Sequence, residues 1–176
     1  MRPWRAPNRC ISRLQNKIDY ENAAALVRRL KAEGKTITCA ESCTGGRIAA
    51  AITAVPGSSA VFPGSIVSYC DGVKHGLLGV PEELLQSVGA VSEDVARAMA
   101  QGAAGVFGTD LALSATGIAG PDGDGSGKPV GTVWLGIFCR GKCRAECHVF
   151  PGDRASVQAL AASRALEMAL EALDKG

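Results

Sequence analysis

The order in which helix-like and strand-like segments follow one another is the feature that most constrains the fold of this chain. Helices are expected at residues 21–33, 47–55, 73–78, 81–88, 92–107 and 153–173, and strands at 36–40, 65–70, 110–114, 130–140 and 143–150. Strands separated by helices favour a parallel sheet, whereas two adjacent strands form a hairpin. The sequence therefore predicts an α/β fold, a three-layer α/β/α sandwich on a mixed, mostly parallel sheet with a late hairpin.

The length of 176 residues suits a single domain with some decoration. Residues 1–19 contain five basic side chains against Asp19 alone. This leader has no continuous apolar stretch of the kind found in a secretory signal, although a transit peptide or a start-site artefact remains an alternative. We expect a basic flexible extension over residues 1–19 and one domain over residues 20–176.

Composition excludes several classes of partner. Nineteen Lys and Arg against seventeen Asp and Glu give a net charge of +2, which is too even for binding nucleic acid through its phosphates. The longest largely apolar run, Ile48–Pro56, is about half of the ~18 residues that a membrane span needs. Seven scattered cysteines, an odd number, fit a reducing compartment. We therefore expect a cytoplasmic protein with no nucleic-acid or membrane partner.

Three motifs for metals or nucleotides fail on inspection. Asp122 stands where the first glycine of a phosphate-binding loop belongs, and Pro129 replaces its Ser or Thr. A calcium loop starting at the same residue would place Val133 where a bidentate carboxylate is required. Five of the cysteines, Cys39 and Cys43 with Cys139, Cys143 and Cys147, are spaced by four residues, and no Cys-x-x-Cys pair occurs, which disfavours zinc. We expect no metal and no cofactor.

Ser42 is the best local candidate for catalysis, because it lies on a predicted turn between a strand and a helix. The unpaired amides of a first helical turn can stabilise an oxyanion, and Gly45 and Gly46 let a substrate approach the backbone. The alternative is that Ser42 or Thr44 simply caps the helix. Lys74 follows a predicted strand next to the first one and is a candidate base, although a solvated helix charge is the alternative.

Several ordered motifs resemble the C-terminal domain family of the competence/damage-inducible protein CinA, from about residue 22 to residue 173. They are Ala40–Gly46, Pro56–Ser59, Tyr69 with Lys74, Gly89–Ser92, Thr116–Pro121, Lys128–Val133 and Gly152–Arg154. This family includes stand-alone nicotinamide-nucleotide amidohydrolases. The chain is similar to these, because it has no room for the additional N-terminal domain of larger members.

The resemblance implies an enzyme that deamidates nicotinamide mononucleotide by a serine-lysine mechanism, without metal or cofactor. Ser42 is then the nucleophile, Lys74 its base, and Tyr69 part of the proton network. The expected substrate-binding residues are Thr44, Gly45, Gly46, Thr116, Gly117 and Arg154. Amides near Gly45 and Gly46 would bind the oxyanion, and Arg154 with the glycines of the 117–127 loop would receive the phosphate.

The expected partners are this small-molecule substrate and further copies of the chain in a homo-oligomer. Two alternatives stay open. An amidase for another small carboxamide would use the same residues, whereas a non-catalytic regulatory or partner-binding module would need none of them.

Overall fold

A computed structural model describes residues 9–174 of the chain, with side chains from residue 19 onward. Its centre is a five-stranded sheet in the order β2-β1-β3-β4-β5. The strands are β1 (Ile37–Glu41), β2 (Ser65–Val67), β3 (Leu111–Gly117), β4 (Thr132–Cys139) and β5 (Lys142–Val149). β2, β1 and β3 pair in parallel, whereas β4 pairs antiparallel with both β3 and β5. The parallel core with its antiparallel end confirms the predicted mixed sheet and late hairpin.

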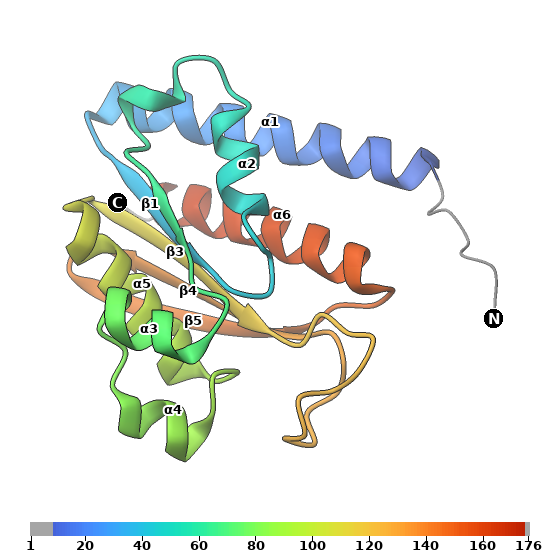
Figure 1. Cartoon of the computed structure of the whole chain (residues 1–176). Coiled ribbons are helices and arrows are strands. Elements are labelled where there is room, and N and C mark those ends of the chain that lie inside the picture. The colour runs from blue at the N-terminus through green and yellow to red at the C-terminus, as the bar shows by residue number, and fades with distance from the viewer. Residues whose placement is uncertain (1–8, 175–176) are drawn as a thin grey trace.

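Helices cover both faces of the sheet and make three layers (Figure 1). One face carries α1 (Arg9–Glu33), α2 (Arg47–Thr53) and α6 (Arg154–Asp174), and the other carries α3 (Asp71–Leu78), α4 (Glu82–Val88) and α5 (Glu93–Phe107). A short 3-10 helix, η1 (Ser58–Ala60), follows α2. None of the helices within the described residues is long and apolar enough to cross a membrane.

The central strands β1 and β3 are buried on both faces of the sheet. Because successive side chains of a strand point to opposite faces, β1 contributes to two separate apolar clusters. Ile37 and Cys39 belong to the cluster under α1, α2 and α6, whereas Ala40 belongs to the cluster under α5. Packing from both sides fixes β1, and with it the carboxyl end of this strand.

The structure differs from expectation at the start of α1, which begins at Arg9 rather than near residue 21. Residues 9–19, expected to belong to a flexible extension, therefore have a helical backbone. The sequence from residue 8 to Glu33 contains no glycine or proline, so no residue interrupts the helix there. Residues 1–8 lie outside the described part of the chain.

The second strand also differs from expectation. A buried strand was expected over residues 65–70, but β2 has three residues, and its side chains are half-buried or exposed. The reason is its position at the edge of the sheet, where β1 is its single neighbour. Its parallel pairing with β1 does confirm that the segment before Lys74 lies beside the first strand.

Candidate active site

Ser42 lies at the carboxyl end of β1, in the turn that leads to α2. Its amide donates a hydrogen bond of 2.8 Å to the carbonyl of Ala115 in β3, and the amide of Ser68 donates one of 2.7 Å to the carbonyl of Glu41. These hydrogen bonds hold the end of β1 and the start of the turn between β3 and the residues that follow Val67. Open α/β sheets bind ligands at the carboxyl ends of their parallel strands. Ser42 therefore lies at the carboxyl ends of the parallel strands, where a reactive group is expected.

The side chain of Glu41 caps the N-terminal end of α2, a role that the sequence reasoning missed. The residue is fully buried, and its carboxylate accepts hydrogen bonds from the amides of Gly46 (3.0 Å), Ile48 (3.1 Å) and Ala49 (2.9 Å). The first amides of a helix lack partners within the helix and carry partial positive charge, so a carboxylate is favoured there. The signal in the sequence was a carboxylate at the end of a strand, a few residues before a helix.

This cap decides which amides of the turn a ligand can use. The amide of Gly46 is engaged by Glu41, and the amide of Gly45 donates to the carbonyl of Ser42 at 3.2 Å. Contrary to expectation, these two amides are not open to an oxyanion. The alternative in which Ser42 or Thr44 caps α2 is also wrong. Gly45 and Gly46 shape the turn itself, since their φ angles are 63° and 97°.

Lys74 is buried, which contradicts the alternative of a solvated helix charge. It lies on α3 with 2% of its side chain exposed, and its ammonium donates a hydrogen bond of 3.1 Å to Oδ1 of Asp71. Asp71 itself is mostly exposed. Lysine is rarely fully buried unless it is paired with another group. Lysines that act as general bases in enzymes are commonly buried.

The environment of Cys43 shows that charges from distant segments act on the turn after Ser42. Burial raises the pKa of the Cys43 thiol to about 12. The positive charges of Arg154 and Lys74 act in the opposite direction and lower it in part. The thiol therefore stays protonated at neutral pH, so Cys43 is no competitor for the role of nucleophile. The fold brings the cations of α3 and α6 close to one turn.

Arg154, in the first turn of α6, contacts Tyr69 directly. One guanidinium N–H donates a hydrogen bond of 2.6 Å to the phenolic oxygen of Tyr69, and another donates one of 2.8 Å to the carbonyl of Gly120. Tyr69 is exposed, so this pair is accessible from solvent. Two of the expected site residues are thus joined by a hydrogen bond.

Thr116 and Gly117, at the end of β3, have structural reasons for their identity. The hydroxyl of Thr116 is buried and donates a hydrogen bond of 2.7 Å to the carbonyl of Ala90. A Cβ at Gly117 would lie 2.5 Å from the carbonyl oxygen of Thr132, so the pairing with β4 requires glycine there. Their contacts with a substrate stay predictions.

Gln158 is a second residue that the sequence reasoning missed. It lies on α6 one helical turn after Arg154, and its Nε2 donates a hydrogen bond of 2.8 Å to the carbonyl of Cys43. The four-residue spacing places both side chains on one face of α6. That spacing was visible in the sequence, but its meaning depended on where α6 packs.

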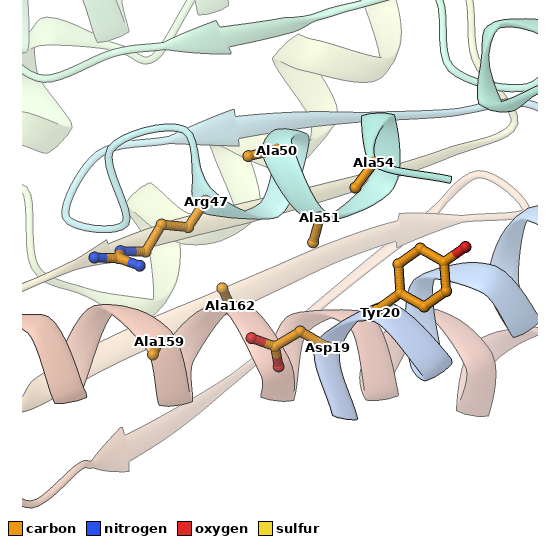
Figure 2. Close-up of a pocket in the computed structure, with 8 residues that line it drawn as sticks. All are labelled: Asp19, Tyr20, Arg47, Ala50, Ala51, Ala54, Ala159 and Ala162. Carbon is orange, nitrogen blue, oxygen red and sulfur yellow. The ribbon is translucent and has the colours of Figure 1, made fainter. Parts of the chain in front are cut away.

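A hollow of about 240 Å³ lies away from these residues, between α1, α2 and α6 (Figure 2). Its lining consists of Asp19, Tyr20, Arg47, Ala50, Ala51, Ala54, Ala159 and Ala162. None of the expected site residues takes part, and most of the lining is alanine. The candidate site is therefore the turn after β1 with its neighbours from α3 and α6.

Comparison with known proteins extends these observations. The sequence model of the CinA C-terminal domain matches residues 19–173. The chain is 48% identical over 152 residues to a nicotinamide-nucleotide amidohydrolase PncC from Enterobacter agglomerans, which covers 86% of this chain and 93% of the relative. It is 51% identical over 143 residues to a CinA-like protein from Geobacter sulfurreducens. That match covers 81% of this chain but 35% of the relative, so the chain spans about a third of such longer proteins.

Solved structures agree with the sequence comparison. A CinA superfamily protein from Klebsiella pneumoniae superposes with a TM-score of 0.87 at 35% identity, covering 90% of this chain and 99% of the other. A competence/damage-inducible protein from Agrobacterium tumefaciens gives a TM-score of 0.83 at 37% identity, covering 89% and 96%. The chain therefore belongs to the CinA C-terminal domain family.

Proposed function

We propose that the chain hydrolyses the carboxamide of nicotinamide mononucleotide to nicotinic acid mononucleotide and ammonia. The observation that carries this proposal is the similarity to the relative named nicotinamide-nucleotide amidohydrolase, 93% of which the chain covers at 48% identity. The substrate class follows that name. The chemistry is argued from the residues around the turn after β1.

In the proposed reaction Ser42 is the nucleophile and Lys74 its general base. The serine oxygen bonds to the carboxamide carbon, its proton passes to the neutral amine of Lys74, and the carbonyl electron pair moves onto oxygen. The C–N bond then breaks, and ammonia leaves with the proton that Lys74 returns, which gives an acyl-enzyme. Water, deprotonated by Lys74, attacks this ester and releases the acid and the Ser42 hydroxyl.

The burial of Lys74 supports its role as the base. Only 2% of its side chain is exposed, so its amine faces the interior next to the sheet rather than the solvent. Its position after β2, the strand beside β1, supports transfer of a proton between Lys74 and the turn that carries Ser42. Tyr69 is proposed to assist this proton network.

Arg154 is proposed to bind the phosphate of the nucleotide. A guanidinium has five N–H donors in a rigid plane, and those not used for Tyr69 and Gly120 suit phosphate oxygens. Thr44, Gly45, Gly46, Thr116 and Gly117 remain the other proposed residues of the substrate site. For Gly45 and Gly46 this means close approach of the substrate to the turn rather than donation from their amides.

The proposal also includes the setting of the enzyme. The six cysteines whose side chains are described are all free thiols, which suits a reducing cytoplasm. We expect a homo-oligomer, and size-exclusion chromatography with light scattering measures its molar mass in solution.

Ammonia release by the purified chain tests the proposal. The amides are nicotinamide mononucleotide, nicotinamide riboside, nicotinamide and glutamine, each with wild type and Ser42→Ala. We expect turnover with the mononucleotide and loss of it in Ser42→Ala, while Ser87→Ala, on exposed α4, keeps the wild-type rate. Preference for another amide would contradict the substrate, and no turnover of any amide would favour a non-catalytic module.

A further inference from the structure

One peptide group of the Ser42 turn is held by a side chain from α6. Nε2 of Gln158 donates to the carbonyl oxygen of Cys43 at 2.8 Å, and Oε1 of the same amide accepts from Nε of Arg47 at 3.4 Å. Figure 2 shows Arg47 extending from α2 past Ala159, toward the N-terminal end of α6. These two contacts orient the Gln158 amide with its nitrogen toward Cys43.

The amides of this turn differ in whether they have an acceptor. Those of Ser42, Gly45 and Gly46 donate to Ala115, Ser42 and Glu41 respectively. Within residues 9–174, the amides of Cys43 and Thr44 donate to no other residue, and the Cys43 amide lies against its own sulfur. Thr44 therefore provides the amide of this turn that a ligand can use.

The carbonyl of Cys43 and the amide of Thr44 belong to the same peptide group. The cis peptide bond of the described chain is Gly120–Pro121, so this group is trans. In a planar trans peptide the C=O and N–H bonds point in opposite directions. By holding the carbonyl on the side of α6, Gln158 directs the Thr44 N–H away from α6, two positions after Ser42.

The side chain of Thr44 gives a second, independent indication of a ligand at this place. Thr44 is 1% exposed, and its hydroxyl oxygen has no hydrogen-bond partner among the residues whose side chains are described. Buried polar groups in native proteins nearly always have a partner. Thr44 therefore carries both an unpaired amide and an unpaired hydroxyl, which indicates a polar group of the substrate at this position.

We propose that Gln158 is a positioning residue that aligns the Thr44 amide to stabilise the oxyanion formed when Ser42 attacks an acyl group. The inference rests on the proposed chemistry of Ser42, but not on the identity of the amide substrate. Gln158 acts through the Cys43–Thr44 peptide group rather than on the substrate. Since Arg154 holds Tyr69 from the same face of α6, this helix positions two parts of the site.

Two variants test the proposal. Gln158→Met has a similar length without the N–H donor, and Gln158→Glu keeps the shape but places an acceptor against the Cys43 carbonyl. Removing an oxyanion donor lowers kcat by about 10²–10³-fold, and misalignment should cost somewhat less, about 10- to 100-fold. We expect this fall in kcat for nicotinamide mononucleotide, with KM within about threefold of wild type, since the oxyanion exists only after attack.

A second readout does not depend on the amide substrate. A fluorophosphonate probe forms a bond between the Ser42 oxygen and phosphorus and releases fluoride, and its P=O oxygen then takes the oxyanion position. The rate of this labelling, followed by intact mass with Ser42→Ala as blank, should fall in parallel with kcat. Labelling that depends on Gln158 in a protein that turns over no nicotinamide mononucleotide would reject the proposed function and keep this inference.

Controls separate positioning from folding. Gln86→Met, on exposed α4, makes the same change remote from the site and should leave both rates unchanged. Thermal unfolding of each variant measures any loss of stability. Both rates within threefold of wild type in Gln158→Met, a raised KM with unchanged kcat, or lowered stability with unchanged kcat for folded protein would each overturn the proposal.

Discussion

The guanidinium of Arg154 donates a hydrogen bond of 2.6 Å to the phenolic oxygen of Tyr69, although 85 positions separate the two residues. A second donor of the same group reaches the carbonyl of Gly120 at 2.8 Å. Arg154 therefore joins the connection after β2 to the loop after β3, across the carboxyl ends of the parallel strands. A planar fork suits this task, because its donors are fixed relative to one another.

Arg154→Lys should raise KM for nicotinamide mononucleotide by about tenfold or more, because one ammonium cannot replace the fork that binds a phosphate. Nicotinamide riboside lacks that phosphate, so any turnover of it should change far less. Steady-state kinetics with both amides measure the difference. Arg97→Lys, exposed on α5, is the matched control. An equal loss with both amides would show that Arg154 does not bind the phosphate.

Glu41→Gln should destabilise the fold by about 1–3 kcal/mol, because the amide NH₂ of glutamine would face backbone N–H donors that have no other acceptor. Glu41 is fully buried and receives all three hydrogen bonds from the start of α2. Urea unfolding at neutral pH measures the change. Glu93 is exposed at the start of α5, so Glu93→Gln should change the free energy of unfolding by a few tenths of the change expected for Glu41→Gln. Equal effects in the two variants would reject the capping role.

Much of the fold follows from the sequence, since periodicity and turn residues place most helices and strands close to their observed bounds. Ser92 illustrates this, because it begins the helix expected over residues 92–107 and caps α5 by accepting a hydrogen bond from the amide of Val95. Ser42 could be singled out from its turn alone. The edge position of β2 could not be derived, because the number of strands beside it depends on the strand order of the folded sheet.

Glu41 and Gln158 show why part of the site was missed. Both act on backbone groups of the turn rather than on side chains, and a sequence does not show which backbone groups lack a partner. For Glu41 the contact is within eight positions, whereas Gln158 is 115 positions from Cys43. Contacts of the second kind depend on how α6 packs against α2.

The hydrogen bonds of Arg164 should make the free energy of unfolding depend on pH in the acid range. Burial alone would raise the pKa of Glu146, but hydrogen bonds from Arg164 and His148 outweigh it and lower that pKa below its ordinary value of 4.5. Arg164 also lowers the pKa of Glu171. A carboxyl whose folded pKa is lowered stabilises the fold above its unfolded pKa, and that contribution disappears as pH falls through the folded value.

Arg164→Met should therefore reduce the free energy of unfolding at pH 7, and the gap to wild type should narrow as pH falls below about 4.5. Urea unfolding between pH 7 and pH 3 measures both quantities. Arg97→Met is the control, since Arg97 lies 3.8 Å from Glu93 in an exposed pair. A gap that stays constant with pH would show that Arg164 stabilises the fold through packing alone.

Chelation should leave turnover unchanged, because the proposed nucleophile, base and oxyanion donor are all groups of the chain. Among the described residues, no group of three or more His, Cys, Asp and Glu is arranged to hold a metal ion. Ammonia release after prolonged dialysis against EDTA, with and without added zinc or magnesium, is the measurement. Activity that is lost on dialysis and restored by one of the metals would contradict the proposed mechanism.

Lys74→Arg should abolish turnover while leaving substrate binding intact. A general base must be neutral when Ser42 attacks, and arginine stays charged throughout the working pH range. Lys74→Met, of similar length and without a proton acceptor, should lose turnover equally, which separates the role of the base from any effect of the larger guanidinium in a buried position. Lys142→Arg, on the exposed side of β5, is the matched control.

Ammonia release measures turnover, calorimetric titration with nicotinic acid mononucleotide measures binding, and thermal unfolding shows whether each Lys74 variant is folded. A folded Lys74→Arg protein with most of the wild-type rate would reject Lys74 as the base. The buried ammonium beside Asp71 would then serve the electrostatics of the site, and another group would have to accept the proton of Ser42.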